Sequence, residues 1–583
     1  LIYLGFREQD IDGHGLGEVL AGDPAVAIAG GHSHAGAERV ALDETALRAW
    51  LETNSGVSAY AVAAQFATRN PAHELRAAGI VQEVTGRPVS CSHHLSARLN
   101  GPKRALTALL NARLIGMIAR LIDRAEGTLE RLGIHAPLMV VRGDGALVSA
   151  EQARERPIET ILSGPAASIV GARWLTGADE ALVSDIGGTT TDVAVLRDGR
   201  PMIDPAGAKV GPWRTMVEAV AMRTTGLGGD SEVHVLEEGL HGGVSLGPRR
   251  LIPVSLIASE APEVVHAALD DQLRRTVPNE HDARFVRAVP GLEADGLPER
   301  EQSLLQRIGD QVYPTGKILK TRLEGQALKR LVARGLVQLA GVTPSDASHV
   351  LGRLKDWDAP AARKALELVG RRRTGSGNML CPEPKTLAQM IVDQLTHQTS
   401  LALLETAFAE DAYEFGHSPE DLARHVLMQR GLSHHKGLVR IESGLNVPVV
   451  GLGASAPSYY PAVGQRLSCR MVLPEHAGVA NAIGAVVGRV TIRRSGTVTC
   501  PAEGKYRVHL ETGPEDHSDA EAAMLALQNA LTAEARAEAV AAGAEDIHTH
   551  AARDLRSAQA EGREVFLEAE ITVEATGRPR VAV

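Results

Sequence analysis

The chain has 583 residues, of which 44% are hydrophobic, 23% are charged and only 3% are aromatic. This length predicts about two to four domains, with cores built from Ala, Val, Leu and Ile. The net charge of −10 excludes the basic face typical of nucleic-acid-binding proteins. The chain has four cysteines and no CxxC pair, which argues against disulfides and a structural zinc site. The sequence contains no apolar run of about 18 residues, so it predicts no membrane-spanning helix. We therefore expect a cytoplasmic protein that binds neither nucleic acid nor membranes.

The N-terminal part of the sequence alternates strand and helix patterns, which is typical of a parallel sheet. Apolar runs at 57–67 and 88–96 predict buried strands. The segment between them predicts a helix with Asn70 as N-cap and Pro71 at the first helical position. A long helix is expected over 104–133, because its apolar residues recur at helical spacing.

The middle of the chain predicts a strand over 136–149 that enters a Gly-Asp-Gly turn, followed by a helix that begins at Ser163. Residues 216–236 predict a helix that breaks into a glycine loop. The polar segment 262–375 predicts a self-contained, mostly helical insertion, after which a long helix at 384–408 returns to the main body.

The C-terminal part begins with a strand, a glycine turn and a helix over 447–464. A small-residue helix suited to close packing is expected at 474–490. Beyond about 491 the pattern mixes strands with an Ala/Glu-rich helix at 519–542, which predicts an α+β domain.

The sequence SDIGGTTTD, residues 184–192, runs from an apolar strand into a glycine turn and back into a strand. Gly187 and Gly188 permit positive φ and a close approach of the backbone to a ligand. Successive N–H groups in such a turn attract anions, and threonine hydroxyls add donors. Asp185 and Asp192 would repel a bare phosphate, so they predict a bridging divalent cation such as Mg²⁺. An ordinary glycine-containing hairpin is the alternative.

Two further glycine loops follow the hairpin, TTGLGGDS at 224–231 and VVGLGASA at 449–456. The second follows an apolar strand and precedes a helix, so its backbone could approach a base or a phosphate. Each loop is weak evidence alone. Three such loops in this order are much less common by chance and together favour a nucleotide site.

The order of these loops resembles the actin-like ATPase fold shared by sugar kinases and actin, and more narrowly the hydantoinase A / 5-oxoprolinase family. The motifs that carry the resemblance are ERPIETILSGPAASIVGA (155–172), SDIGGTTTDVAV (184–195), GLGGDS (226–231) and PEHAGVANAIGAVVG (474–488), with FATRNPAHELRAAGIVQEVTGRPVSCSHHLS upstream.

The resemblance implies a two-lobed α/β fold of the actin-like ATPase (ribonuclease H-like) type, with a helical insertion and a small C-terminal α+β domain. The expected domains are the remainder of an N-terminal lobe (1–175), a nucleotide-binding second lobe (176–261 and 376–490), the insertion (262–375) and the C-terminal domain (491–583).

Family members use ATP to phosphorylate an amide or carbonyl oxygen, which activates it for hydrolysis or carboxylation. The resemblance thus implies an ATP-dependent cyclic amidase that opens a hydantoin or 5-oxoproline type of ring. ATP and Mg²⁺ are the implied cofactors, and a second, B-type subunit is the implied partner in a hetero-oligomer. A ketone carboxylase subunit of the acetone or acetophenone type, and a nucleotide-binding regulatory protein without turnover, are the alternatives.

Asp185 and Asp192 are the implied catalytic residues and magnesium ligands. The implied nucleotide-binding residues fall into three groups. They are Gly187, Gly188, Thr189 and Thr190 for the β- and γ-phosphates, Gly228, Gly229 and Asp230 for the phosphates or ribose, and Gly451, Gly453 and Ala454 for the adenosine.

Two departures from the family pattern stand out. A second phosphate hairpin is expected nearer the N-terminus, yet none precedes residue 184, and the chain starts without Met in an apparent strand. We therefore expect about a hundred residues to be missing upstream, judged from domain size. In addition, Arg223 stands near a position where the family often has His, so no base is assigned there.

Two histidine-containing segments could carry other chemistry. His32 and His34 have a spacing that can bind metal, although solvated loop histidines are more common. Cys91, His93 and His94 follow a predicted strand, where a substrate might lie, although a buried cysteine in a sheet is the simpler interpretation.

Overall fold

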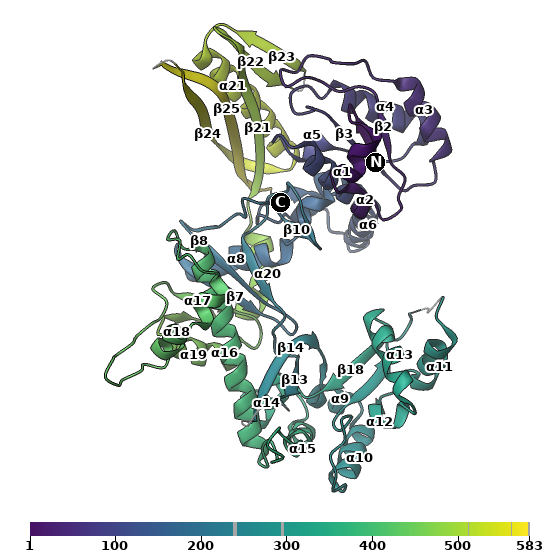
Figure 1. Cartoon of the computed structure of the whole chain (residues 1–583), viewed down its shortest axis with the longest axis vertical. Coiled ribbons are helices and arrows are strands. Elements are labelled where there is room, and N and C mark those ends of the chain that lie inside the picture. The colour runs from purple at the N-terminus through teal and green to yellow at the C-terminus, as the bar shows by residue number, and fades with distance from the viewer. Residues whose placement is uncertain (237–241, 293–295, 511, 561–562, 581–583) are drawn as a thin grey trace. The chain divides into compact units, whose positions relative to one another are not determined.

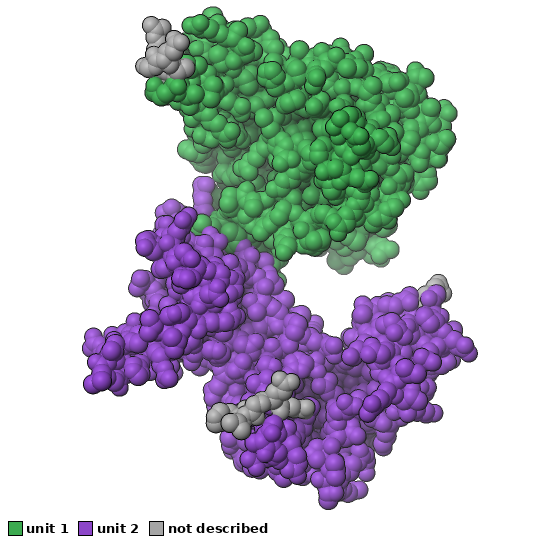
Figure 2. Space-filling model, in the orientation of Figure 1, with its two compact units in different colours: residues 1–171, 201–221, 481–583 green, residues 172–200, 222–480 purple. Residues whose placement is uncertain are grey.

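A computed structural model describes residues 1–236, 242–292, 296–510, 512–560 and 563–580. The chain folds into two compact units, which Figure 2 shows in different colours. Unit 1 comprises residues 1–171, 201–221 and 481–583, and unit 2 comprises residues 172–200 and 222–480. The N- and C-terminal segments therefore share one unit, and the finer domain boundaries expected from the sequence stay a prediction.

The N-terminal part of unit 1 is a parallel sheet in the order β2-β1-β3-β4 (Figure 1). Its strands are β1 (Ile2–Leu4), β2 (Val26–Ile28), β3 (Tyr60–Ala64) and β4 (Val89–Cys91). Its helices are α1 (Glu8–Gly13), α2 (Leu16–Leu20), α3 (Glu44–Thr53), α4 (Ala72–Thr85), α5 (Ser92–Leu95) and α6 (Gly101–Arg131). Every residue of β3 is buried, because its alternate side chains enter two different hydrophobic clusters. The predicted strand, helix and strand are confirmed, but the N-cap is Pro71 and the helix begins at Ala72, one residue later than predicted. Asn70 Oδ1 still accepts from the Ala72 N–H at 3.0 Å.

Helix α6 is the one helix among the described residues that is long and apolar enough to cross a membrane. Half of its most apolar window is buried inside the protein. Its polar side chains also find partners there, since Asn111 Nδ2 donates to Ser90 Oγ and to Glu155 O, each at 3.0 Å. These contacts are those of a core helix of unit 1.

The C-terminal part of unit 1 is a sheet in the order β23-β22-β21-β25-β24, to which β6 and then β5 attach through β21. Its strands are β5 (Met139–Val141), β6 (Leu147–Ser149), β21 (Val490–Ala502), β22 (Lys505–Leu510), β23 (Gly513–His517), β24 (Ala544–Ala560) and β25 (Arg563–Pro579). The predicted helix at 519–542 is confirmed as α21 (Ala520–Ala541), whose Leu527 and Leu531 pack into the core of this sheet. The other elements of unit 1 are α7 (Ala150–Glu155), η1 (Pro157–Thr160), β10 (Lys209–Val210) and β11 (Trp213–Arg214), while α8 (Ser163–Thr176) and α20 (Ala480–Val487) lie mainly in it.

The centre of unit 2 is a sheet in the order β12-β8-β7-β19-β20, in which β7 is antiparallel to β8 and parallel to β19. Its strands are β7 (Ala181–Ile186), β8 (Thr191–Arg197), β12 (Met222–Thr225), β19 (Val449–Leu452) and β20 (Met471–Val472). The associated helices are α16 (Pro384–Glu410), α17 (Pro419–Arg424), α18 (Val426–Leu432), α19 (Ala456–Arg466) and η2 (Ala477–Val479). The predicted helix at 384–408 and the strand, turn and helix at 447–464 are therefore confirmed.

The helix predicted within 216–236 is wrong. These residues instead include β12 and β13 (Ser231–Val235), which flank the glycine loop. β12 pairs antiparallel with β8, with Met222 opposite Ala194, so sheet pairing overrides the helix-like spacing of the apolar residues.

The segment 262–375 contains the expected helices but also a small sheet. The sheet has the order β15-β18-β16-β17, and β15 precedes the segment, so the segment is not self-contained. The elements of this region are β14 (Val244–Arg250), β15 (Ile252–Pro253), α9 (Val254–Glu260), α10 (Pro262–Leu273), β16 (Phe285–Ala288), α11 (Glu299–Ile308), β17 (Tyr313–Pro314), α12 (Thr315–Ile318), α13 (Arg322–Ala333), β18 (Val337–Gly341), α14 (Pro344–Val350) and α15 (Ala359–Gly370).

Candidate functional site

The turn between β7 and β8 brings the two predicted acidic residues together. Asp185 lies directly opposite Asp192 in the antiparallel register. Side chains at opposite positions of such a pair share one face of the sheet, with Cβ atoms about 5 Å apart. The turn is closed by the Gly187 N–H, which donates to Thr190 O at 2.9 Å. Thr189 is exposed at its tip. The hairpin thus presents two carboxylates beside a short glycine and threonine turn.

The electrostatics of Asp192 favour a cation beside it. Burial raises its pKa, and the negative charge of Asp185 raises it further, although hydrogen bonds from Thr224 and Thr190 act in the opposite direction. The Thr224 hydroxyl donates to Asp192 Oδ1 at 2.7 Å. Two carboxylates and a hydroxyl are oxygen donors of the kind that Mg²⁺ prefers. The residues present therefore fit the predicted metal.

We expect Asp192→Asn to raise the melting temperature of the metal-free protein at neutral pH. The folded-state pKa of Asp192 is raised, so its contribution to stability is present at low pH and is lost as pH rises through that pKa. Asparagine resembles the protonated acid and can still accept from Thr224. Thermal melts in a chelator at pH 7.5 and pH 5 measure this gain, which should shrink at the lower pH. If the variant and the parent protein melted at the same temperature at pH 7.5, this prediction would be wrong.

The second glycine loop packs directly onto this hairpin. Gly229 N–H donates to Gly187 O at 3.1 Å, and Asp230 N–H donates to Gly188 O at 2.9 Å. A Cβ at Gly228 would lie 2.5 Å from Gly187 O and 2.6 Å from the carbonyl carbon of Gly188. Only glycine fits there without moving backbone. The second glycine loop and the hairpin are therefore packed tightly against each other.

Asp230 is held by other protein groups at this junction. Arg250 Nη2 lies 3.1 Å from one carboxylate oxygen, and the Ser345 hydroxyl donates to the other at 3.2 Å. Burial raises the pKa of Asp230, and Arg250 counteracts that effect. Its carboxylate is so close to Gly188 that a Cβ on that glycine would lie 2.6 Å from Oδ2. Asp230 thus packs against the hairpin turn. Its contact with a nucleotide stays a prediction.

The third loop lies against the end of β7. Gly453 has φ of +106°, and a Cβ there would lie 2.2 Å from Ile186 O and 3.5 Å from Asp185 Oδ1. Ala454 is exposed beside it. The backbone at Gly453 therefore lies close to Ile186 and Asp185 at the end of β7.

Gly451 has a packing role in the sheet. It is buried in β19, and a Cβ there would lie 2.6 Å from the ring of Tyr460. The Tyr460 hydroxyl in turn donates to Ser184 O at 2.8 Å. This packing accounts for a glycine at 451 without a contact to adenosine.

We expect Tyr460→Phe to lower the free energy of unfolding by about 1–3 kcal/mol, because the buried Ser184 loses its hydrogen-bond partner. Urea denaturation followed by circular dichroism measures this loss. Tyr413→Phe is the matched control, since Tyr413 is 68% exposed, and it should change little. A Tyr460→Phe variant as stable as the parent would contradict the proposed link between α19 and β7.

The structure brings all the predicted site residues to one end of the unit 2 sheet, although they come from three distant segments. Sequence reasoning did not find Thr224, Arg250 and Ser345, which contact the predicted acids. Thr224 lies at the start of the predicted glycine loop 224–231, but its pairing with Asp192 depends on the β12–β8 register. Ser345 lies at the start of α14, and no local pattern links it to residue 230.

Two family models match the chain. The hydantoinase/oxoprolinase model matches residues 104–257, and the model of the hydantoinase/oxoprolinase N-terminal region matches residues 16–85. Residues 16–85 and 104–257 of the chain thus match the hydantoinase/oxoprolinase family. The first match includes the acidic hairpin and the second glycine loop of the candidate site.

The curated relatives of this chain carry names that refer to different compounds. Caprolactamase subunit alpha of Pseudomonas jessenii is 29% identical over 220 residues, which is 37% of this chain and 31% of that protein. The acetophenone carboxylase gamma subunit of Aromatoleum aromaticum is 27% identical over 226 residues, which is 36% of this chain and 29% of that protein. 5-Oxoprolinase 1 of Arabidopsis thaliana is 30% identical over 149 residues, which is 24% of this chain and 11% of that protein. The matched stretches thus span less than a third of each relative.

Two solved structures are similar to the whole chain. The ATP-dependent caprolactamase from Pseudomonas jessenii matches with a TM-score of 0.59 and 16% identity over 100% of this chain and 77% of that chain. Nucleotide-free acetone carboxylase matches with a TM-score of 0.54 and 15% identity over the same shares. At such identities the likeness shows the fold, and it confirms the predicted mixed α/β fold of the actin-like ATPase type.

Proposed function

We propose that this chain is the ATP-dependent subunit of a cyclic amidase that opens a hydantoin or 5-oxoproline type of ring. The observation that supports this most is the convergence of three glycine loops on the pair Asp185 and Asp192. Phosphate binding needs backbone N–H groups without obstructing side chains, and it needs a counter-charge. Both are available at this end of the sheet.

In this proposal the chain positions the phosphates and their metal. Bound Mg²⁺ would neutralise charge on the β- and γ-phosphates of ATP. Asp185 and Asp192 would hold that ion, and the N–H groups and hydroxyls at 188–190 would donate to phosphate oxygens. Gly229 and Gly453 would let the backbone approach the nucleotide closely.

The chemical reason for using ATP is the low reactivity of an amide. Transferring a phosphoryl group to the amide oxygen creates a good leaving group, after which water can open the ring. Relatives named caprolactamase and 5-oxoprolinase support a cyclic amide as the substrate class. Relatives named as alpha and gamma subunits support a second, B-type subunit as partner.

ATP-dependent ketone carboxylation is the second candidate. The similarity to the acetophenone carboxylase gamma subunit and to acetone carboxylase favours it. The same phosphate site would serve, because a ketone enolate oxygen can accept a phosphoryl group just as an amide oxygen can.

Release of ADP by the chain, assayed with its partner subunit, separates these functions. The substrates to compare are 5-oxoproline, hydantoin and caprolactam, and acetone or acetophenone with bicarbonate. Stimulation by a cyclic amide alone supports the amidase, and stimulation by a ketone with bicarbonate supports the carboxylase. Tight ATP binding without stimulation by any of them would contradict both and indicate a regulatory nucleotide-binding protein.

A further inference from the structure

A polar cavity lies in unit 1, apart from the residues of the glycine loops. It has a volume of about 320 Å³ and is lined by His93 and its neighbours, by α7 and by parts of β21 and α21. Five arginines and five glutamates line it, so it carries charges of both signs. Such a lining suits a small dipolar molecule more than an apolar one.

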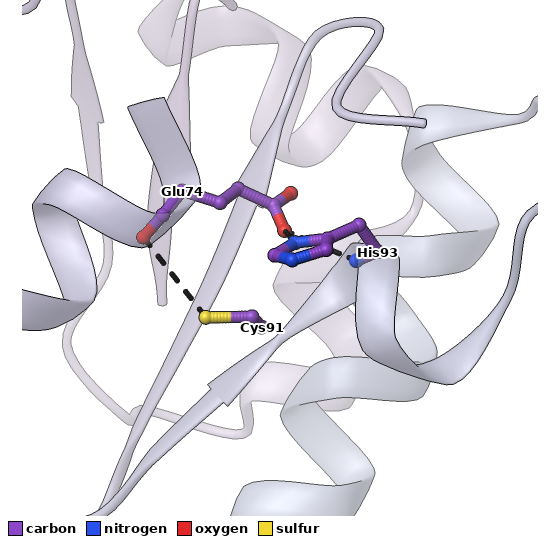
Figure 3. Close-up of side chains that lie close together, drawn as sticks. All are labelled: Glu74, Cys91 and His93. Atoms are coloured by element: carbon purple, nitrogen blue, oxygen red, sulfur yellow. Dashed lines mark hydrogen bonds and ion pairs between the residues drawn. The ribbon is translucent and has the colours of Figure 1, made fainter. Parts of the chain in front are cut away.

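His93 at this cavity is oriented by a buried acid. Figure 3 shows Glu74 of α4 and His93 of α5, with Glu74 Oε2 lying 2.6 Å from His93 Nδ1. Glu74 is fully buried, which opposes its ionisation, but contacts with His93, Arg104 and Ser92 outweigh burial and lower its pKa. The ionised Glu74 can only accept, so Nδ1 of His93 carries a proton. Nε2 is then the ring nitrogen left for another partner.

Two polar atoms at the cavity lack a partner among the residues that the structure describes. His93 Nε2 is buried on a side chain only 5% exposed, and Gln152 Oε1 is buried likewise. The orientation of the Gln152 amide is fixed, because its Nε2 donates to the carboxylate of Glu538. Unpartnered buried polar atoms are rare because they cost free energy, and together these two call for a polar ligand, with an N–H group for the amide oxygen Gln152 Oε1.

Arg156 supplies a complementary positive charge to the cavity. Its Nη1 lies 4.0 Å from Glu159, which is too far for a hydrogen bond. A guanidinium has five N–H donors and binds carboxylates in a fork geometry. The cavity therefore combines a largely buried carboxylate-binding group with two unpartnered polar atoms.

A metal site at this position does not fit the donor set. Glu74, Cys91 and His93 lie close enough together to hold an ion (Figure 3). However, burial and the charge of Glu74 raise the pKa of the Cys91 thiol far above its ordinary value, and a thiol must lose its proton to bind metal. Ser92 and the N–H groups of Ala64 and His93 also occupy the Glu74 carboxylate.

We propose that this cavity binds a small molecule that carries both N–H groups and a carboxylate, such as an amino acid or a cyclic amide with an acid substituent. Gln152 Oε1 would accept from its nitrogen, His93 Nε2 would form a second hydrogen bond with its polar groups, and Arg156 would bind its carboxylate. The choice between amino acid and cyclic amide rests on the proposed function, whereas the site itself rests on the geometry of unit 1.

Calorimetric titration of the full chain with 5-oxoproline, without nucleotide, tests the proposal. We expect saturable one-to-one binding that weakens at least tenfold in His93→Gln and in Arg156→Gln. His550→Gln is the matched control, because His550 is exposed on β24, and it should bind like the parent. Circular dichroism shows whether each variant is folded, and Gln152→Ala provides a further cavity variant should His93→Gln unfold.

Two comparison compounds test which groups of the ligand the cavity binds. 2-Pyrrolidinone lacks the carboxylate and should bind at least tenfold more weakly than 5-oxoproline, and L-glutamate should compete. The proposal is overturned if neither 5-oxoproline nor glutamate saturates, or if the cavity variants bind as the parent does. Asp185→Asn should leave this binding unchanged while it removes ATP binding, so failure of the cavity and failure of the nucleotide site are told apart.

Discussion

Asp185→Asn should reduce Mg²⁺-dependent ATP hydrolysis about a hundredfold or more. Asp185 and Asp192 are opposite each other on the hairpin, and each proposed metal contact needs an ionised carboxylate. The amide keeps the size of the side chain but removes the charge that would hold the cation. Substrate-stimulated ADP release, measured across a range of Mg²⁺ concentrations, gives both the rate and the apparent metal affinity.

Asp198→Asn is the matched control for this variant. Asp198 follows the far end of β8, is exposed and has φ of +51°, a conformation that asparagine also tolerates. The control should hydrolyse ATP at the parent rate. If Asp185→Asn also kept that rate and the parent Mg²⁺ dependence, the assignment of Asp185 as a metal ligand would be wrong.

Gly453→Ala should lower the free energy of unfolding by about 3 kcal/mol and abolish nucleotide binding. Its positive φ is strained for alanine, and the added methyl group would lie 2.2 Å from Ile186 O. Relief of that contact must move the third loop away from Asp185. Urea denaturation measures the stability change, and titration with a non-hydrolysable ATP analogue measures binding.

Gly325→Ala separates this effect from a general cost of replacing glycine. Gly325 lies within α13, and a Cβ there would have no neighbour within 4 Å. Alanine is the better helix former, so this control should gain about 0.5–1 kcal/mol and bind nucleotide as the parent does. Parent-like binding by Gly453→Ala would show that the third loop lies outside the nucleotide site.

Much of the candidate site was predictable because its signals are local. The turn at 187–190 and the loop at 226–230 need glycines for close backbone approach, and these glycines are neighbours in the sequence. Strand β7 and helix α16 were predicted for the same reason, since apolar runs and helical spacing are local patterns.

The features that the sequence did not reveal depend on contacts between distant segments. Residues 222–225 form strand β12 because they pair with the edge of β8, although the apolar residues around them have helical spacing. The hydrogen bond from Ser345 to Asp230 joins residues 115 positions apart. Likewise, no local pattern shows that the ring of Tyr460 packs against Gly451.

The order of strands in the unit 2 sheet has a consequence for biosynthesis. β7 lies between β8 and β19, yet β19 is made more than 260 residues later. While the ribosome is still translating the intervening segments, one side of this apolar strand has no partner, and such an edge promotes aggregation. Nascent chains arrested before residue 449 should therefore need a chaperone to stay soluble.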